Sequence, residues 1–362
     1  MSNKEILSES NTPKQKQKFD YSNAETILKV ENLRQYFKLQ GKALKAVDNI
    51  SFDVKKKEVF GIVGESGSGK TTTGRSIIGL YDITGGDVWL RDKLINTGLE
   101  VRKNQIKIAK NAGKVDTVKK LEDDYKKSKK EIEDNRDALH RKIQMIFQDP
   151  VSSLDPRMTV REIIAEGLII QGEKDKKLIN EKVDSVLNQV GLLVEHADRY
   201  PHEFSGGQRQ RIGIARAIIM EPEVIIADEP VSALDVSIQA QIINLLNDLR
   251  EKNDLTVIFI AHDLAVVKYI SDRIAVMFNG KIVELAESDE LFARPMHPYT
   301  KSLLSAIPVP DPHLERLRKR ETYVPALEHD YSIEEPTMRE VFPNHFVYCN
   351  SEEEEKFKNL YK

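Results

Sequence analysis

The chain has 362 residues, and its 55 Lys and Arg almost balance its 58 Asp and Glu, so the formal net charge is −3. This balance predicts no general attraction to nucleic acid or to anionic lipid, and the lack of any run of about 18 apolar residues predicts no membrane-spanning helix. The single cysteine, Cys349, excludes an intrachain disulfide and a cysteine-ligated zinc or iron–sulfur centre, and it suits a reducing compartment.

The N-terminal part begins with a polar stretch. Residues 1–24 are predicted to be a disordered leader, because they lack the apolar centre of a signal peptide. Alternating apolar residues at 27–30 and 46–54 predict half-buried antiparallel strands, with Gly41 in the turn between them. Tyr36 and Phe37 lie shortly before this turn. Either ring could stack on an adenine, and the alternative is a strand aromatic that only fills a core.

The next stretch fits the phosphate-binding pattern G-x-x-x-x-G-K-[ST]. A short apolar strand over residues 59–63 precedes it and a helix from Thr72 follows it, which is the context that the pattern requires. Its glycines let backbone N–H groups turn toward an anion, and the helix N-terminus adds partial positive charge. We expect Lys70 to reach the β- and γ-phosphates and the Thr71 hydroxyl to bind Mg²⁺. The predicted phosphate-binding residues are Gly64, Glu65, Ser66, Gly67, Ser68, Gly69, Lys70, Thr71 and Thr72.

A strand predicted at residues 85–90 is followed by a change of composition. Residues 98–141 are dominated by Lys, Glu and Asp, and residues 111–113 divide them into two helical pieces. The longer piece has one narrow apolar stripe with a seven-residue repeat, formed by Val118, Tyr125, Ile132 and Leu139. A two-stranded coiled coil needs a wider apolar seam. We therefore favour a solvated helical insertion, with a partner-binding element as the alternative.

Strand character returns at residues 142–147 and is followed by Gln148. A 3.6-residue period then predicts a helical segment over about residues 150–205, after which another helix begins at residues 205–208. A buried strand over residues 224–227 ends in Asp228 and Glu229. An acidic pair at the carboxyl end of a strand beside a phosphate loop suits Mg²⁺ binding by Asp228 and activation of water by Glu229.

Another apolar strand, residues 256–261, ends at His262. A single histidine usually has a structural role, but the carboxyl edge of a parallel sheet is where ligands bind, so we expect a γ-phosphate contact. Asn279 and Gly280 predict a β-hairpin. From residue 286 the chain alternates proline and charge, and we expect a mostly irregular C-terminal extension without a substantial core.

The order of these motifs resembles that of the ABC ATPases over about residues 27–285. The phosphate loop, Gln148, residues 205–209, Asp228 with Glu229, residues 232–235 and His262 look like the Walker A, Q-loop, signature, Walker B, D-loop and H-loop. Phe204 stands where the signature usually has leucine. The resemblance implies an α/β P-loop NTPase (RecA-like) core with an N-terminal antiparallel β-subdomain, a helical subdomain and the extension 286–362.

Residues 199–207, 297–304 and 307–312 look like the oligopeptide/dipeptide importer branch, and within it the F-type ATPase subunits. The resemblance implies an ATPase that powers peptide import from the cytoplasmic face of the membrane, as a peripheral subunit. It also implies ATP and Mg²⁺, a homologous second ATPase subunit in a heterodimer, two membrane-spanning permease subunits and an extracytoplasmic peptide-binding protein. Some members hold an iron–sulfur cluster in the tail, which the single Cys349 excludes here.

The family's head-to-tail dimer further implies roles for single residues. Phe37, with Tyr36 as second choice, stacks on adenine, and Thr71, Gln148 and Asp228 hold Mg²⁺. Gln148, Glu229 and His262 act on the attacking water and the γ-phosphate. The residues that face the partner's nucleotide are Ser205, Gly206, Gly207, Gln208 and Asp235.

Other functions stay open at this point. An importer of another cargo, such as nickel, a dipeptide or a sugar, would share these motifs, because other subunits read the cargo. A translation-associated ABC ATPase, which binds ribosomal RNA, resembles two cassettes in one chain, whereas this chain has one phosphate loop and no basic net charge. A DNA-repair ATPase needs a far longer coiled coil than residues 98–141 provide.

Overall fold

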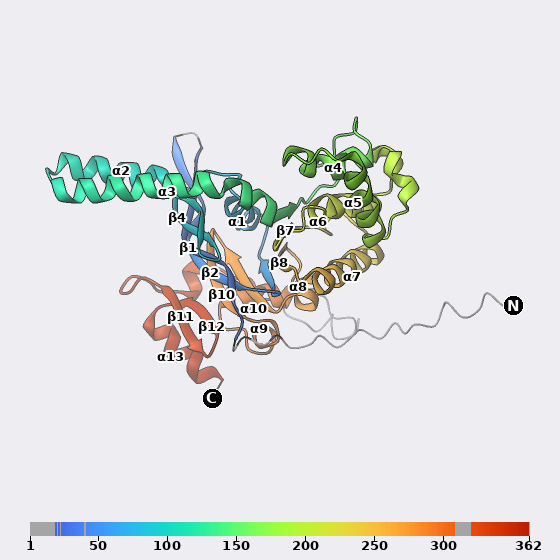
Figure 1. The fold of residues 1–362 in the computed structure, drawn as a ribbon. Coiled ribbons are helices and arrows are strands. Elements are labelled where there is room, and N and C mark those ends of the chain that lie inside the picture. The colour runs from blue at the N-terminus through green and yellow to red at the C-terminus, as the bar shows by residue number, and fades with distance from the viewer. Residues whose placement is uncertain (1–18, 20, 22, 40, 308–319, 362) are drawn as a thin grey trace, which may run out of the picture.

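A computed structural model describes residues 19, 21, 23–39, 41–307 and 320–361. The predicted leader, apart from a few of its last residues, and most of the stretch 307–312 lie outside the described residues. Figure 1 shows two β-sheets at the centre, a helical lobe on one side, and a long helical hairpin and the C-terminal extension on the other. Within the described ranges, no helix combines the length and the hydropathy needed to cross a membrane.

The smaller sheet is antiparallel, in the order β2-β1-β4-β5. Gly41, with φ +80°, lies in the turn between the two longest strands, as predicted. One face of the smaller sheet packs on the central core, and the residues on that face are apolar. This one-sided burial gives the alternation of apolar and polar residues seen in the sequence. The strands are β1 (Thr26–Leu39), β2 (Lys42–Lys55), β4 (Gly85–Leu90) and β5 (Lys93–Thr97).

The larger sheet has the order β11-β12-β10-β9-β3-β8-β7-β6. Five neighbouring strands are parallel: β9 (Arg273–Phe278), β3 (Val59–Val63), β8 (Thr256–Ala261), β7 (Val224–Asp228) and β6 (Ile143–Ile146). Both of their faces are buried, which explains their continuous apolar sequences. In β3, Phe60 and Ile62 face the core shared with the smaller sheet, whereas Val59 and Val63 face the core shared with the helical lobe.

Helices cover both faces of this sheet. Helix α1 (Lys70–Ile77) lies beside the smaller sheet, and α7 (Val236–Asn253) and α8 (Leu264–Ile270) pack on the opposite face. The helical lobe contains α4 (Val160–Ile170), α5 (Lys176–Gln189), two 3₁₀ turns (Val194–Asp198 and Pro201–Glu203) and α6 (Gly206–Ile218). Thr159 and Glu162 form a capping box that fixes the start of α4. Within the predicted helical segment, the structure thus has two α-helices and two 3₁₀ turns joined by loops.

The charged insertion is an antiparallel helical hairpin of α2 (Leu99–Asn111) and α3 (Val115–Lys142), divided at residues 112–114, one residue later than predicted. Helix α3 packs against α2 and against β5, and Val118, Tyr125 and Ile132 of its apolar stripe are half-buried. Leu139 differs from them, because it is buried in the central core. Leu139, the last member of the stripe, therefore connects α3 to the central core.

The C-terminal extension contains more regular structure than its sequence suggests. Asn279 and Gly280, both with positive φ, form the predicted hairpin between β9 and β10 (Lys281–Glu287). Strand β12 (His345–Cys349) then pairs with β10, and β11 (Thr337–Phe342) completes the sheet. The helices of the extension within the described ranges are α9 (Ser288–Ala293), α10 (Pro298–Ala306), α12 (Pro325–Glu328) and α13 (Ser351–Leu360).

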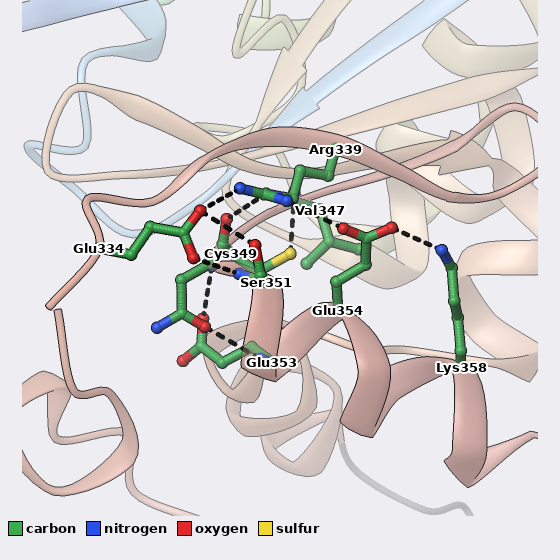
Figure 2. A network of polar contacts seen from close by, with 9 residues as sticks. Glu334, Arg339, Val347, Cys349, Ser351, Glu353, Glu354 and Lys358 are labelled. Atoms are coloured by element: carbon green, nitrogen blue, oxygen red, sulfur yellow. Dashed lines mark hydrogen bonds and ion pairs between the residues drawn. The ribbon is translucent and has the colours of Figure 1, made fainter.

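A small core and a polar network hold the extension together. Cys349 is buried between the β11–β12 hairpin and α13, and burial raises the pKa of its thiol to about 12. Figure 2 shows Arg339 at the centre of the network. Its guanidinium contacts Glu354 of α13 at 3.1 Å and Glu334 at 2.5 Å, and it donates to the Cys349 carbonyl at 3.1 Å. The hairpin is thereby fastened to α13.

A buried carboxylate joins the extension to the main sheet. Glu284 of β10 is fully buried and accepts hydrogen bonds from the backbone N–H groups of Met296 and His297, at 2.8 and 3.0 Å. Its Oε1 also lies 2.8 Å from Nε2 of His345, which is buried as well. Because a buried charge is costly unless it is paired, these contacts fix the extension against β10.

Candidate functional site

Four adjacent parallel strands end at the same edge of the larger sheet. The phosphate loop follows β3, Gln148 lies just beyond β6, Asp228 ends β7 with Glu229 directly after it, and His262 follows β8. In an open parallel sheet, ligands bind at the carboxyl ends of the strands. The structure therefore brings together the residues that the sequence predicts for phosphate binding and for catalysis.

The phosphate loop is shaped by glycines that no other residue could replace without displacing the backbone. A Cβ on Gly64 would lie 2.2 Å from the Met277 carbonyl oxygen, and one on Gly69 would lie 2.3 Å from the Ala46 carbonyl oxygen. Gly69 also has φ +105°, which favours glycine. Strand β2, which carries Ala46, thus packs directly on the loop.

Lys70 begins α1 and turns back over the loop. Its Nζ donates to the carbonyl oxygens of Gly64 and Glu65, both at 2.8 Å. The side chain is only 5% exposed, and burial lowers its pKa. These two carbonyls hold a poorly solvated cation at the centre of the loop, where an anion would be attracted.

Thr71 and Asp228 connect the loop to β7. The Thr71 hydroxyl donates to Asp228 Oδ1 at 2.8 Å. Asp228 is fully buried, its Oδ2 has no hydrogen-bond partner among the described residues, and burial raises its pKa. A buried carboxylate with one unpartnered oxygen, next to a hydroxyl, is a donor set that suits a hard cation such as Mg²⁺.

Glu229 is the centre of a second cluster. Its Oε2 accepts a hydrogen bond from Gln148 Nε2 at 3.2 Å and lies 3.1 Å from Nδ1 of His262. A pocket of about 50 Å³ lies beside the carboxylate and is lined in part by Ser232, Gln239 and His262. This volume admits a water molecule, and a carboxylate and an imidazole offer such a water hydrogen-bond partners.

The two aromatic candidates for base stacking differ in their contacts. The Tyr36 hydroxyl donates to Asp48, and the Lys45 ammonium lies 5.6 Å from the centre of its ring. The ring of Phe37 meets only Tyr81 among the described aromatic residues, edge-on at 5.3 Å. Because Tyr36 is held by these contacts and Phe37 has fewer, the ring of Phe37 is the more available of the two for stacking on a base.

The predicted signature residues lie at the start of α6. Ser205 Oγ accepts from the Gln208 N–H at 3.4 Å, and Gln208 Oε1 accepts from the Ser205 N–H at 3.0 Å, which is a capping box. A Cβ on Gly207 would lie 2.5 Å from the Ile238 side chain, so α6 and α7 approach closely there. Asp235 caps α7 by accepting from the Ile238 N–H at 3.1 Å. In the part of the chain that the structure describes, no hydrogen bond joins Gly206 or these caps to the phosphate loop.

Tyr299 is a contact of the loop that sequence reasoning missed. Its hydroxyl oxygen accepts a hydrogen bond from the Glu65 N–H at 3.0 Å, although the two residues are 234 positions apart. The side chain is 1% exposed, and burial raises the pKa of its hydroxyl to about 12. Its ring packs against Phe278 and Tyr323, with centroids 4.5 and 5.5 Å away. The only sequence signal was the His-Pro-Tyr run at residues 297–299.

Comparison with known proteins decides the family. The profile of the family described as "ABC transporter" matches residues 47–232, and the one described as "Oligopeptide/dipeptide transporter, C-terminal region" matches residues 283–332. The oligopeptide transport ATP-binding protein OppF of Bacillus subtilis (strain 168) is 51% identical over 334 residues, which cover 92% of this chain and 99% of that protein. The chain belongs to the ATP-binding proteins of the ABC transporter family.

Other members of this ABC transporter family agree with the match. AmiF of Streptococcus pneumoniae serotype 4, also an oligopeptide transport ATP-binding protein, is 47% identical over 91% of this chain and 97% of its own length. The dipeptide transport ATP-binding protein DppF of Lactococcus lactis is 47% identical over 92% of this chain and 96% of its own length.

Solved ABC cassettes share the fold. A dimeric, post-hydrolysis structure of the cassette MJ0796, bound to ADP and Pi, is 26% identical, with a TM-score of 0.56 over 72% of this chain and 99% of that one. The cassette cbiO1 of Clostridium perfringens is 26% identical, with a TM-score of 0.59 over 81% and 98% of the two chains. The predicted α/β P-loop architecture is therefore confirmed.

Proposed function

We propose that this chain binds and hydrolyses ATP and thereby powers the import of oligopeptides through a membrane transporter. The observation that carries the proposal is the joining of Lys70, the Thr71–Asp228 pair and the Glu229 cluster at one sheet edge. The names of the relatives support the cargo. The same support extends to dipeptides, because DppF is similar to this chain to a comparable degree.

In this proposal the loop N–H groups and Lys70 hold the ATP phosphates, and Phe37 stacks on the adenine. Thr71, Asp228 and Gln148 would hold Mg²⁺, which would supply positive charge to neutralise the phosphates. Asp228 suits this role because its second oxygen is unpartnered.

Glu229 acts as the base in the hydrolysis step. Its carboxylate orients a water and accepts its proton, while the water oxygen attacks the γ-phosphorus and the bond to the bridging oxygen of ADP breaks. His262, at 3.1 Å from the Glu229 carboxylate, fixes that side chain and contacts the γ-phosphate. Gln148 joins Glu229 to the segment that leads into the helical lobe, so it links nucleotide occupancy to the position of that lobe.

We further propose a head-to-tail dimer with a homologous ATPase subunit, in which Ser205, Gly206, Gly207, Gln208 and Asp235 face the partner's ATP. The dimeric state of the similar cassette MJ0796 supports the formation of a dimer. Two permease subunits and an extracytoplasmic peptide-binding protein complete the transporter, and the chain lies on the cytoplasmic face of the membrane. Residues 27–285 form the ATP-binding domain, with the insertion 98–141 and the helical subdomain at about 150–205, and residues 286–362 form the extension.

Glu229→Gln tests the catalytic assignment. The amide keeps the shape of the side chain but cannot accept a proton, so we expect ATP binding to persist and hydrolysis in the assembled complex to fall by on the order of 10²–10⁴. Wild-type hydrolysis by this variant would show that Glu229 is not the base at a working site.

Labelling with an azido-ATP tests the dimer. Lys70→Ala should abolish labelling of this chain, because Lys70 serves the nucleotide that the chain itself carries. Ser205→Arg should leave this labelling intact and still impair transport, since it obstructs closure on the partner's nucleotide. If Ser205→Arg removes label from this chain and spares the partner, the assignment across the dimer is wrong.

A further inference from the structure

The helical insertion has a charge unlike that of the rest of the chain. Residues 99–142 contain fourteen Lys or Arg and nine Asp or Glu, a net charge of +5, whereas the remaining residues contain 41 basic and 49 acidic ones, a net charge of −8. The excess lies at the far end of the hairpin. Residues 103–120, which we call the insertion tip, contain six lysines and one aspartate, and the other residues of the insertion contain eight of each sign.

The insertion tip lies away from the body of the protein. The last hydrogen bonds from α3 to the smaller sheet join Glu131 and Asn135 to the backbone of Leu94, at 3.1 and 3.3 Å. Val115, where α3 begins, precedes Glu131 by sixteen residues, or about 24 Å along a helix axis. Figure 1 shows α2 and α3 projecting together past the smaller sheet.

The end of the insertion tip combines exposed apolar and basic side chains. Ile108 is 68% exposed and Val115 is 78% exposed, and they flank the turn at residues 112–114. Four exposed lysines have no carboxylate within ion-pair distance in the described part of the chain: Lys107, Lys114, Lys119 and Lys120. Exposed aliphatic groups surrounded by lysines are typical of segments that bind a membrane surface.

We propose that the insertion tip binds the surface of a membrane that contains anionic phospholipids. The lysines contact the phosphate groups, and Ile108 and Val115 enter the layer between headgroups and acyl chains. Nucleic acid would satisfy the lysines but would leave the two aliphatic side chains in water. The anionic membrane surface repels the rest of the chain, which has a negative net charge. The helical hairpin therefore holds the body of the protein at a distance from the membrane.

Flotation with lipid vesicles tests this proposal on the full chain. We expect binding to vesicles of mixed phosphatidylcholine and phosphatidylglycerol, little binding to pure phosphatidylcholine, and release in about 1 M NaCl, where charges are screened beyond ~3 Å. Each basic side chain near an anionic surface contributes roughly a fivefold gain in binding. A variant with the four substitutions Lys107→Glu, Lys114→Glu, Lys119→Glu and Lys120→Glu should therefore bind at least about 100-fold more weakly.

The control reverses four exposed lysines farther along α3: Lys126, Lys127, Lys129 and Lys130. It changes the net charge equally and should retain binding within about threefold, because these residues lie outside the insertion tip. Both variants should keep the thermal unfolding and ATP hydrolysis of the parent. Equal losses in the two variants, equal binding to neutral vesicles, or no binding by the parent would overturn the proposal. Displacement of the vesicles by mixed-sequence RNA at a lower concentration than that of the lipid would overturn it in favour of nucleic acid.

Discussion

Replacing Tyr299 by Phe isolates the contact between the C-terminal extension and the phosphate loop. The substitution removes one oxygen and keeps the ring, which packs on Phe278 and Tyr323. The Glu65 N–H then loses its acceptor at 3.0 Å. Because this N–H is only partly buried, water can replace the acceptor in part, and we assign the loss about 1–1.5 kcal/mol, near the middle of the range for a hydrogen bond left unmade.

The assay is titration of the purified chain with a fluorescent ATP analogue. If the lost hydrogen bond loosens the loop that receives the phosphates, the dissociation constant rises by about five- to tenfold, since 1.4 kcal/mol is a factor of ten. Lys70 also depends on this region, because its ammonium is held by the carbonyls of Gly64 and Glu65. We therefore expect Tyr299→Phe to weaken ATP binding measurably while the melting temperature of the chain changes little.

Tyr323→Phe provides the matched control for this experiment. Tyr323 belongs to the same aromatic cluster, but its hydroxyl makes no hydrogen bond to the phosphate loop among the described residues. The control should bind ATP like the parent. An affinity of Tyr299→Phe within twofold of the parent, or an equal loss in both variants, would refute the view that the Tyr299 hydroxyl supports the loop.

Three further predictions concern the insertion, a buried histidine and the lone cysteine. Replacing residues 103–126 by a short Gly/Ser turn should leave ATP hydrolysis within about tenfold, or 1.4 kcal/mol of barrier; a larger loss would show that the insertion takes part in turnover. Burial lowers the pKa of His297 to about 3. As the pH falls below about 6.5, this histidine is therefore protonated in the unfolded chain but not in the folded chain. The free energy of unfolding should consequently drop by about 2 kcal/mol from pH 7 to pH 5. His297→Asn, which can still cap α10, should flatten this dependence in denaturant titrations, and an unchanged slope would contradict the reasoning. The purified chain should contain no iron, because Cys349 is its only cysteine; stoichiometric iron with acid-labile sulfide would disprove this.

Much of the catalytic edge could be predicted because short-range signals specify it. The apolar runs of β3, β7 and β8 end directly in the phosphate loop, in Asp228 and Glu229, and in His262, and parallel strands place such ends side by side. The hairpin at Asn279 and Gly280 was predictable for the same reason, since two adjacent residues determine the turn.

The contacts that sequence reasoning missed are long-range or made by edge elements. No local pattern relates Tyr299 to Glu65, 234 positions earlier. Strand β11 has exposed polar residues because it lies at the sheet edge, so its alternation is weak. The seven-residue stripe of α3 was visible, but only packing shows that Leu139 leaves the stripe and enters the central core. The end of α3 therefore belongs to the core of the protein, although its charged composition assigns it to the insertion.

The pairing of β12 with β10 also has a consequence for protein synthesis. Strand β10 ends at Glu287 and β12 ends at Cys349, which is 62 residues later. At about 5–20 residues per second, the edge of β10 stays open for roughly 3–12 s after β10 is complete. During that time its free N–H and C=O groups can pair with another nascent chain. A chain that ends before residue 337 keeps this edge of β10 unpaired permanently. Pairing of β12 with β10 therefore protects the chain against pairing of β10 with other chains.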